Sequence, residues 1–133
     1  MWLLDTNVVS ARRRSSPAAA HTLATLAEER TFISVLTLGE IMKGAEKQRR
    51  RDLMFANILR AWLDDVTASF DMRILPVSRD VALVWGAIAS GRSRSVEDAL
   101  IAATAIVHDL TLVTRNTRDF DDLPLKLFNP WGE

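Results

Sequence analysis

Short apolar runs alternate with longer stretches of helical periodicity along this chain. The short runs are apolar or β-branched and end at polar residues, which predicts strands at 1–4, 31–36, 72–77, 111–114 and 125–128. Apolar side chains at steps of three and four predict helices between them, over 17–30, 37–48, 51–70, 78–90 and 95–107. A further short helix is expected after residue 5. Alternating strands and helices predict one three-layer α/β/α domain over 1–133, with a mostly parallel central sheet of four to five strands.

Composition excludes several classes of protein. The chain has no cysteine, so disulfides and thiolate metal sites are ruled out, and its two separated histidines, His21 and His108, make a zinc site a poor candidate. Seventeen basic and seventeen acidic side chains give no net charge, so nucleic-acid binding would have to come from local clusters. No apolar run approaches the ~18 residues of a membrane span. Asp5 also interrupts the order expected of a signal peptide, and a cytoplasmic location is expected.

Acidic residues follow the predicted strands or begin the predicted helices. Asp5 directly follows the first strand, Glu40 follows the second and Asp119 follows the fourth. Because ligands of open α/β sheets bind at the carboxyl ends of the strands, these acids are expected at one edge. Asp98 begins a helix that leads into the fourth strand, so it joins them only if that helix starts at the same edge and runs back down.

Each acid also has a purely structural interpretation. Asp5 suits the cap of the following helix, and Glu40 has capping-box spacing from Thr37. Asp98 lies in the first turn of a helix that Ser95 can cap, where the helix dipole favours negative charge. Asp119 suits an ordinary loop. The sequence pattern leaves both interpretations open.

Converging carboxylates repel one another, and a hard divalent cation with oxygen ligands relieves this repulsion. Without cysteine or a well-placed histidine, Mg²⁺ or Mn²⁺ is the expected metal. Such a site can lower the pKa of a water and stabilise the attacking and leaving oxygens of a phosphodiester. Several arginines lie close to the acids in sequence and are candidate RNA contacts: Arg12, Arg13, Arg14, Arg115 and Arg118.

Five short strings, taken in order, resemble the PIN-domain ribonucleases, and among these the VapC toxins of VapBC-type toxin–antitoxin modules, particularly a FitB-like subgroup. The strings span essentially the whole chain: Leu3–Ser10, Ser34–Ile41, Asp98–Ala105, Leu112–Phe120 and Phe128–Trp131. The resemblance implies an endoribonuclease that uses Mg²⁺ or Mn²⁺ and leaves a 5′-phosphate and a 3′-hydroxyl.

The resemblance also implies which residues form the site. Asp5, Glu40 and Asp98 are the central metal-binding and catalytic acids. The resemblance leaves the position of the fourth acid open between Asp119 and Asn116. Asp119 is the candidate ligand, and Asn116 has a supporting role. By the same resemblance, Thr6 and Thr114 orient carboxylates or water.

The resemblance further implies a homodimeric toxin that a small cognate antitoxin of the VapB or FitA type inhibits. A larger toxin–antitoxin assembly that binds DNA through the antitoxin is also expected, and no membrane association. The alternative interpretation is a catalytically inactive PIN-like module that binds partners without turnover.

Overall fold

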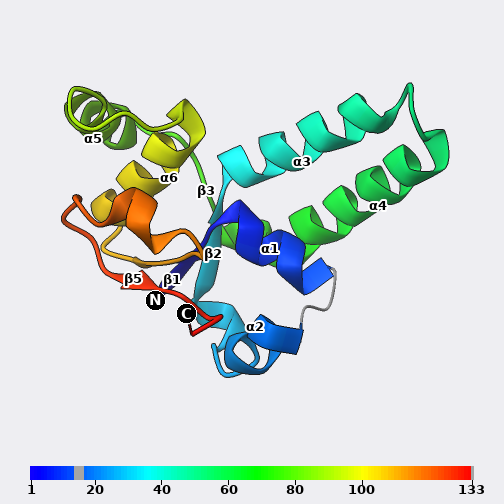
Figure 1. Cartoon of the computed structure of the whole chain (residues 1–133), viewed down its shortest axis with the longest axis horizontal. Coiled ribbons are helices and arrows are strands. Elements are labelled where there is room, and N and C mark those ends of the chain that lie inside the picture. Colours follow the sequence, from blue (N-terminus) through cyan, green and yellow to red (C-terminus); the bar gives the residue numbers. More distant parts are fainter. Residues whose placement is uncertain (14–16, 133) are drawn as a thin grey trace.

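A parallel sheet forms the middle layer of the molecule (Figure 1). Within residues 1–13 and 17–132, which the computed structural model describes, five strands build it: β1 (Trp2–Leu4), β2 (Thr31–Ser34), β3 (Ile74–Leu75), β4 (Thr111–Val113) and β5 (Leu127–Phe128). Their order across the sheet is β3-β2-β1-β4-β5, and every pairing is parallel. The expected α/β/α fold with a parallel sheet is therefore confirmed.

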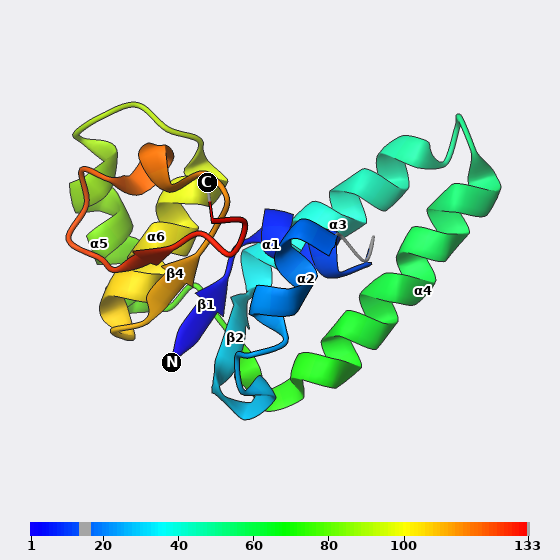
Figure 2. The ribbon, with the colours of Figure 1, turned by 60° about the horizontal axis from the view of Figure 1, so that its bottom comes forward.

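Helices cover both faces of this sheet. They are α1 (Thr6–Arg13), α2 (Pro17–Leu23), α3 (Val35–Gln48), α4 (Leu53–Phe70), α5 (Arg79–Ala89) and α6 (Val96–Val107). Short 3₁₀ helices, η1 (Glu28–Arg30), η2 (Asp71–Arg73) and η3 (Thr117–Phe120), complete the chain. Helices α5 and α6 lie on one side of the sheet and α1 and α2 on the other, while α3 and α4 form a long hairpin that projects outward (Figure 2). Among the described helices, none has both the length and the apolar character needed to cross a membrane.

The alternation of side chains along each strand divides the core in two. Leu3 and Leu112 are fully buried against α5 and α6, whereas their neighbours Leu4 and Val113 pack with α1, α2 and α4 on the opposite face. Successive residues of a strand point to opposite faces, so two adjacent apolar residues in each of these strands contribute to both halves of the core. The small alanines of α6 let it approach the sheet closely, and most of this helix is buried.

Several element boundaries differ from those that the sequence pattern predicts. The expected helix over 17–30 ends at Leu23, where the Thr25 hydroxyl donates to the Thr22 carbonyl at 2.6 Å and competes with the helix. The second strand ends at Ser34 rather than 36, because the Ser34 side chain caps α3. The third strand is only Ile74–Leu75, since η2 occupies the residues before it.

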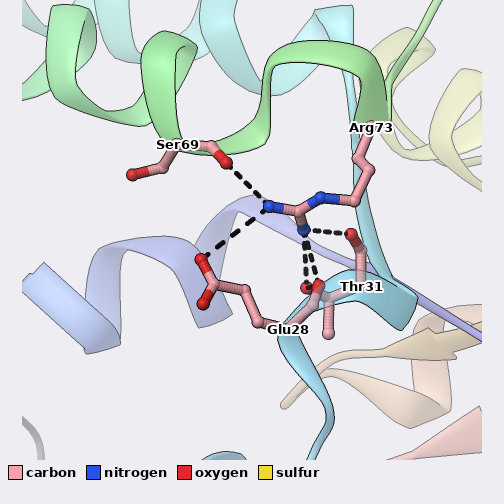
Figure 3. A network of polar contacts seen from close by, with 4 residues as sticks. All are labelled: Glu28, Thr31, Ser69 and Arg73. Carbon is pink, nitrogen blue, oxygen red and sulfur yellow. Dashed lines mark hydrogen bonds and ion pairs between the residues drawn. The ribbon is translucent and has the colours of Figure 1, made fainter.

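Arg73 ties the end of α4 to the start of β2 (Figure 3). Its Nη1 donates to the carbonyls of Glu28 and Thr31, each at 2.7 Å, and its Nη2 donates to the Ser69 carbonyl at 2.7 Å. The guanidinium lies 4.8 Å from the centroid of the Phe70 ring. The planar guanidinium holds its donors in a fixed arrangement, so it satisfies three backbone carbonyls at once.

Replacing this cation should destabilise the protein. We expect Arg73→Met to lower the free energy of unfolding by about 2–4 kcal/mol, because charge-assisted bonds are lost and carbonyls are left unpaired. Urea denaturation measures this change. Arg79→Met, at an exposed position on α5, is the matched control and should change stability by less than about 0.5 kcal/mol. Equal effects of the two substitutions would contradict the structural role of Arg73.

Candidate active site

Asp5 lies at the carboxyl end of the central strand β1 and is buried, with 5% of its surface exposed. Its Oδ1 accepts a hydrogen bond from the Thr6 backbone N–H at 2.8 Å, and its Oδ2 accepts one from the Thr114 hydroxyl at 2.9 Å. The Asn7 side-chain amide donates to Oδ2 at 3.4 Å and to the Thr114 hydroxyl at 3.3 Å. The carboxylate is therefore held in one orientation by groups from α1 and from the end of β4.

Glu40 lies on the second turn of α3 and is half-buried. Its Oε1 accepts a hydrogen bond from the Thr6 hydroxyl at 3.0 Å, and Thr6 is also 2.9 Å from the hydroxyl of the buried Thr37. Because the single Thr6 proton goes to Glu40, Thr37 is the donor to Thr6. The capping-box interpretation of Thr37 and Glu40 is wrong, since Ser34 caps the helix and both side chains instead turn toward α1.

Asp98 lies in the first turn of α6. The Ser95 hydroxyl accepts a hydrogen bond from the Asp98 backbone N–H at 3.1 Å, so Ser95 caps the helix, as the spacing predicts. After α6 ends, the chain enters β4 at Thr111, whose N–H donates to the Met1 carbonyl at the start of β1. Helix α6 therefore runs from the carboxyl edge of the sheet to its amino edge. This is the direction that Asp98 needs to face the other acids.

The acids influence one another's ionisation. The pKa of Asp5 is raised, mainly by burial and further by the charges of Asp98 and Asp119, although its hydrogen bonds act in the opposite direction. Burial also raises the pKa of Glu40, with contributions from Asp5, Asp98 and Glu97, and it raises the pKa of Asp98, with contributions from Asp119 and Glu97. Thr6 donates to both Asp5 and Glu40, and Glu40 and Asp98 line one cleft, so these three acids share one region of the sheet edge.

The two candidates for the fourth acid differ in what they contribute. Asp119 lies in η3 with an exposed side chain, and its charge acts on both Asp5 and Asp98. Asn116 contributes its backbone N–H, which donates to the Thr114 hydroxyl at 3.1 Å. Asp119 thus adds negative charge to the site, while Asn116 helps to fix the hydroxyl that holds Asp5.

The donor set suits a hard divalent cation. Carboxylate oxygens are the ligands of Mg²⁺ and Mn²⁺, and a cation offsets the repulsion that adds to the effect of burial on these pKa values. Among the described residues, no three acidic, histidine or cysteine side chains are grouped closely enough to hold a metal as they stand. Mg²⁺ retains several of its waters and takes only one or two carboxylates directly, so the residues present fit this ion.

The predicted RNA-contacting arginines lie in several environments. Arg12 and Arg13 line a cavity of about 210 Å³ beside α4, and the Arg13 guanidinium is 5.3 Å from the Trp62 ring centroid. Arg115 lies 5.0 Å from the centroid of the Trp131 ring. The Arg118 carbonyl accepts a hydrogen bond from the side chain of Arg92. Arg14 lies outside the described residues, and RNA contact by these arginines stays a prediction.

The roles of three residues of the site were not predicted from the sequence. Asn7 bridges Asp5 and Thr114, Thr37 donates to Thr6, and Glu97 adds charge beside Glu40. Asn7 and Thr37 resemble helix-cap residues in sequence, and only contacts between distant segments reveal their roles. Glu97 is signalled solely by being next to Asp98.

Comparison with known proteins identifies the family. The model of the PIN domain matches residues 2–126. The chain belongs to the PIN domain family. This PIN domain is 31% identical to the VapC ribonuclease Y4jK of Sinorhizobium fredii, over 98% of both chains. Its structure is similar to that of FitAcB from Neisseria gonorrhoeae, with a TM-score of 0.89 and 33% identity over all of both chains. A toxin–antitoxin complex from Klebsiella pneumoniae matches with a TM-score of 0.73 and 30% identity, over 98% of both chains.

The buried Asp5 charge should reduce the stability of the metal-free PIN domain. A folded-state pKa raised above the ordinary 3.8 means that the folded chain holds this proton more tightly than the unfolded chain. Stability therefore falls as the pH rises through the raised pKa. We expect Asp5→Asn to raise the thermal unfolding midpoint at neutral pH by a few degrees, measured in the presence of a chelator.

The rise in the unfolding midpoint caused by Asp5→Asn should shrink as the pH is lowered towards 3.8, the ordinary pKa of aspartate, because the wild-type carboxyl also becomes uncharged there. Asp80→Asn, which removes an exposed carboxylate from α5, is the control. A gain that is independent of pH, or one that the control reproduces, would show that Asp5 is not under electrostatic strain.

Proposed function

We propose that this PIN domain is a toxin endoribonuclease that hydrolyses RNA phosphodiester bonds with Mg²⁺ or Mn²⁺. The observation that carries the proposal is the buried Asp5 carboxylate at the sheet edge, whose pKa is raised by burial and by the charges of Asp98 and Asp119. Burial and neighbouring like charges make ionisation of such an acid costly, which supports a chemical rather than a structural role. The identity to a VapC ribonuclease supports the same activity.

Asp5, Glu40 and Asp98 would hold the metal, and Asp119 would complete the set. The metal, when bound, supplies a water of lowered pKa and positive charge for the oxygens of the scissile phosphodiester. The protein groups keep the carboxylates in place. Thr114 fixes Asp5 and Thr6 fixes Glu40 through their hydroxyls, so neither acid has to reorganise when substrate arrives.

The proposed partner is an antitoxin. A protein that matches this PIN domain over nearly its whole length was solved as a toxin–antitoxin complex. We propose that a cognate antitoxin inhibits this chain as well, and that the active form is a homodimer.

Loss of the central acids should abolish RNA cleavage. We expect Asp5→Asn and Asp98→Asn each to reduce Mg²⁺-dependent cleavage of single-stranded RNA at least about 100-fold, more than the loss of an outer-shell partner costs. The measurement is single-turnover cleavage of an end-labelled oligonucleotide. Asp80→Asn, purified in parallel, should cleave at the wild-type rate. Cleavage that survives both acid substitutions points to a contaminating nuclease and sinks the proposal.

Thr114 should act by positioning Asp5. Thr114→Val keeps the side-chain shape but removes the hydroxyl that donates to Asp5 at 2.9 Å. We expect the affinity for Mn²⁺, measured by calorimetric titration, to fall about 10- to 100-fold, as is usual for outer-shell partners of metal ligands. Thr111→Val, at the start of β4, is the control and should bind Mn²⁺ as the wild type does. Unchanged Mn²⁺ affinity in Thr114→Val would exclude the positioning role. No Mn²⁺ binding by the wild type would leave the inactive binding module as the better account.

A further inference from the structure

A cleft of about 290 Å³ opens beside the candidate site, between α3 and the N-terminal turn of α6. Its α3 wall is formed by Glu40, Lys43, Gly44 and Lys47, and Asp98 lies on the α6 side. Positions three and four residues apart lie on one face of a helix, so this wall is a continuous stripe that begins at a candidate metal ligand. The cleft is therefore continuous with the site and extends along α3, away from the sheet.

The far part of this wall is positively charged. The chain contains three lysines, and two of them, Lys43 and Lys47, line the cleft. Both side chains are exposed, and within the described part of the chain neither forms an ion pair, although Glu40 and Glu97 line the same cleft. Because neither lysine is paired with these carboxylates, both ammonium groups remain available to a negatively charged ligand.

Gly44 lies between the two lysines in sequence and in the wall of the cleft. Glycine is among the least favourable residues in a helix interior, and Gly44 is in the middle of α3. A Cβ atom built at this position would meet nothing within 4 Å, so packing inside the protein does not require a glycine here. A glycine that is unnecessary for packing and lines a cleft lets a ligand approach the helix backbone closely.

We propose that this cleft is the subsite that holds the RNA strand on one side of the cleaved bond. Lys43 and Lys47 each contact a backbone phosphate, and Gly44 leaves room for the strand against α3. This inference rests on the proposed function and deepens it, because it directs the substrate along α3 rather than toward the arginines of α1. The lysine end of the wall suits a polyanion, whereas a second copy of this chain has no net negative charge to bring to it.

The number of phosphate contacts can be measured from the salt dependence of binding. We use Asp5→Asn as the background so that RNA stays intact, and titrate a fluorescently labelled single-stranded RNA at fixed Mg²⁺ and varied NaCl. Binding weakens as salt is added, and each phosphate contact contributes about 0.7 to the steepness of the plot of log K against log salt. The double variant Lys43→Gln, Lys47→Gln should therefore make this plot less steep by about 1.4. The control is Lys126→Gln, which changes the third lysine, located with the C-terminal part of α6 in another cavity, and should leave the slope unchanged.

A pair of glycine variants tests whether the RNA strand approaches the backbone of α3 closely at Gly44. Gly44→Ala and Gly86→Ala both add a methyl group in open space within a helix. Both should raise the thermal unfolding midpoint by similar amounts. Only Gly44→Ala should weaken RNA binding, by several-fold, because Gly86 lies on α5 outside the cleft.

Each contrary result has a distinct meaning. RNA binding with an unchanged slope in the double lysine variant overturns the subsite and leaves the ribonuclease proposal intact. A change in oligomeric mass, measured by light scattering, without a change in slope would assign the cleft to contact between copies of the chain and overturns the subsite as well. A wild-type protein that neither binds nor cleaves RNA overturns both.

Discussion

Negative charge held out of water is the constraint on which this structure depends. Asp5 is almost completely buried, and the nearest groups that stabilise its charge are neutral donors rather than a cation. The charges of Asp98 and Asp119 act on it from two other segments. Burial and like charge both oppose ionisation, so the folded chain carries an electrostatic cost that its hydrophobic core must offset. A divalent cation bound at this place would remove the cost, and metal affinity and fold stability would then be linked.

Hydroxyl groups set the geometry of the site because each has one proton to donate. Thr37 donates to Thr6, and Thr6 donates to Glu40, which joins α3 to α1. Thr114 donates to Asp5 while it accepts from Asn116 and Asn7, which joins the end of β4 to β1. These chains of hydrogen bonds have a single direction, and every acceptor at their ends is a carboxylate. The acids are therefore held by neutral groups that leave their negative charge available to the proposed metal.

Local chemistry was predictable from the sequence, whereas contacts between distant segments were not. The alternation of elements gave the correct layers, and the cap at Ser95 is confirmed because a cap depends only on residues a few positions away. Glu40 was ambiguous because its local spacing from Thr37 fits a capping box, and only Thr6, far away in the sequence, decides where both side chains point. The position of Asp98 depended on the direction of α6, which no local pattern encodes. Nothing local in the sequence singles out Lys43 and Lys47, because the cleft that they line forms only where α6 lies beside α3.

The junctions between strands and helices have almost no connecting loop. Asp5 alone separates β1 from α1, and α3 begins at the residue after β2 ends. One inserted residue at either junction would rotate the following helix by about 100° and carry its side chains off the face that meets the acids. Length variation should therefore be strongly disfavoured there in natural sequences. The turn over residues 49–52, at the far tip of the α3–α4 hairpin, has no such restriction, and homologues of different length are expected to differ at that tip (Figure 2).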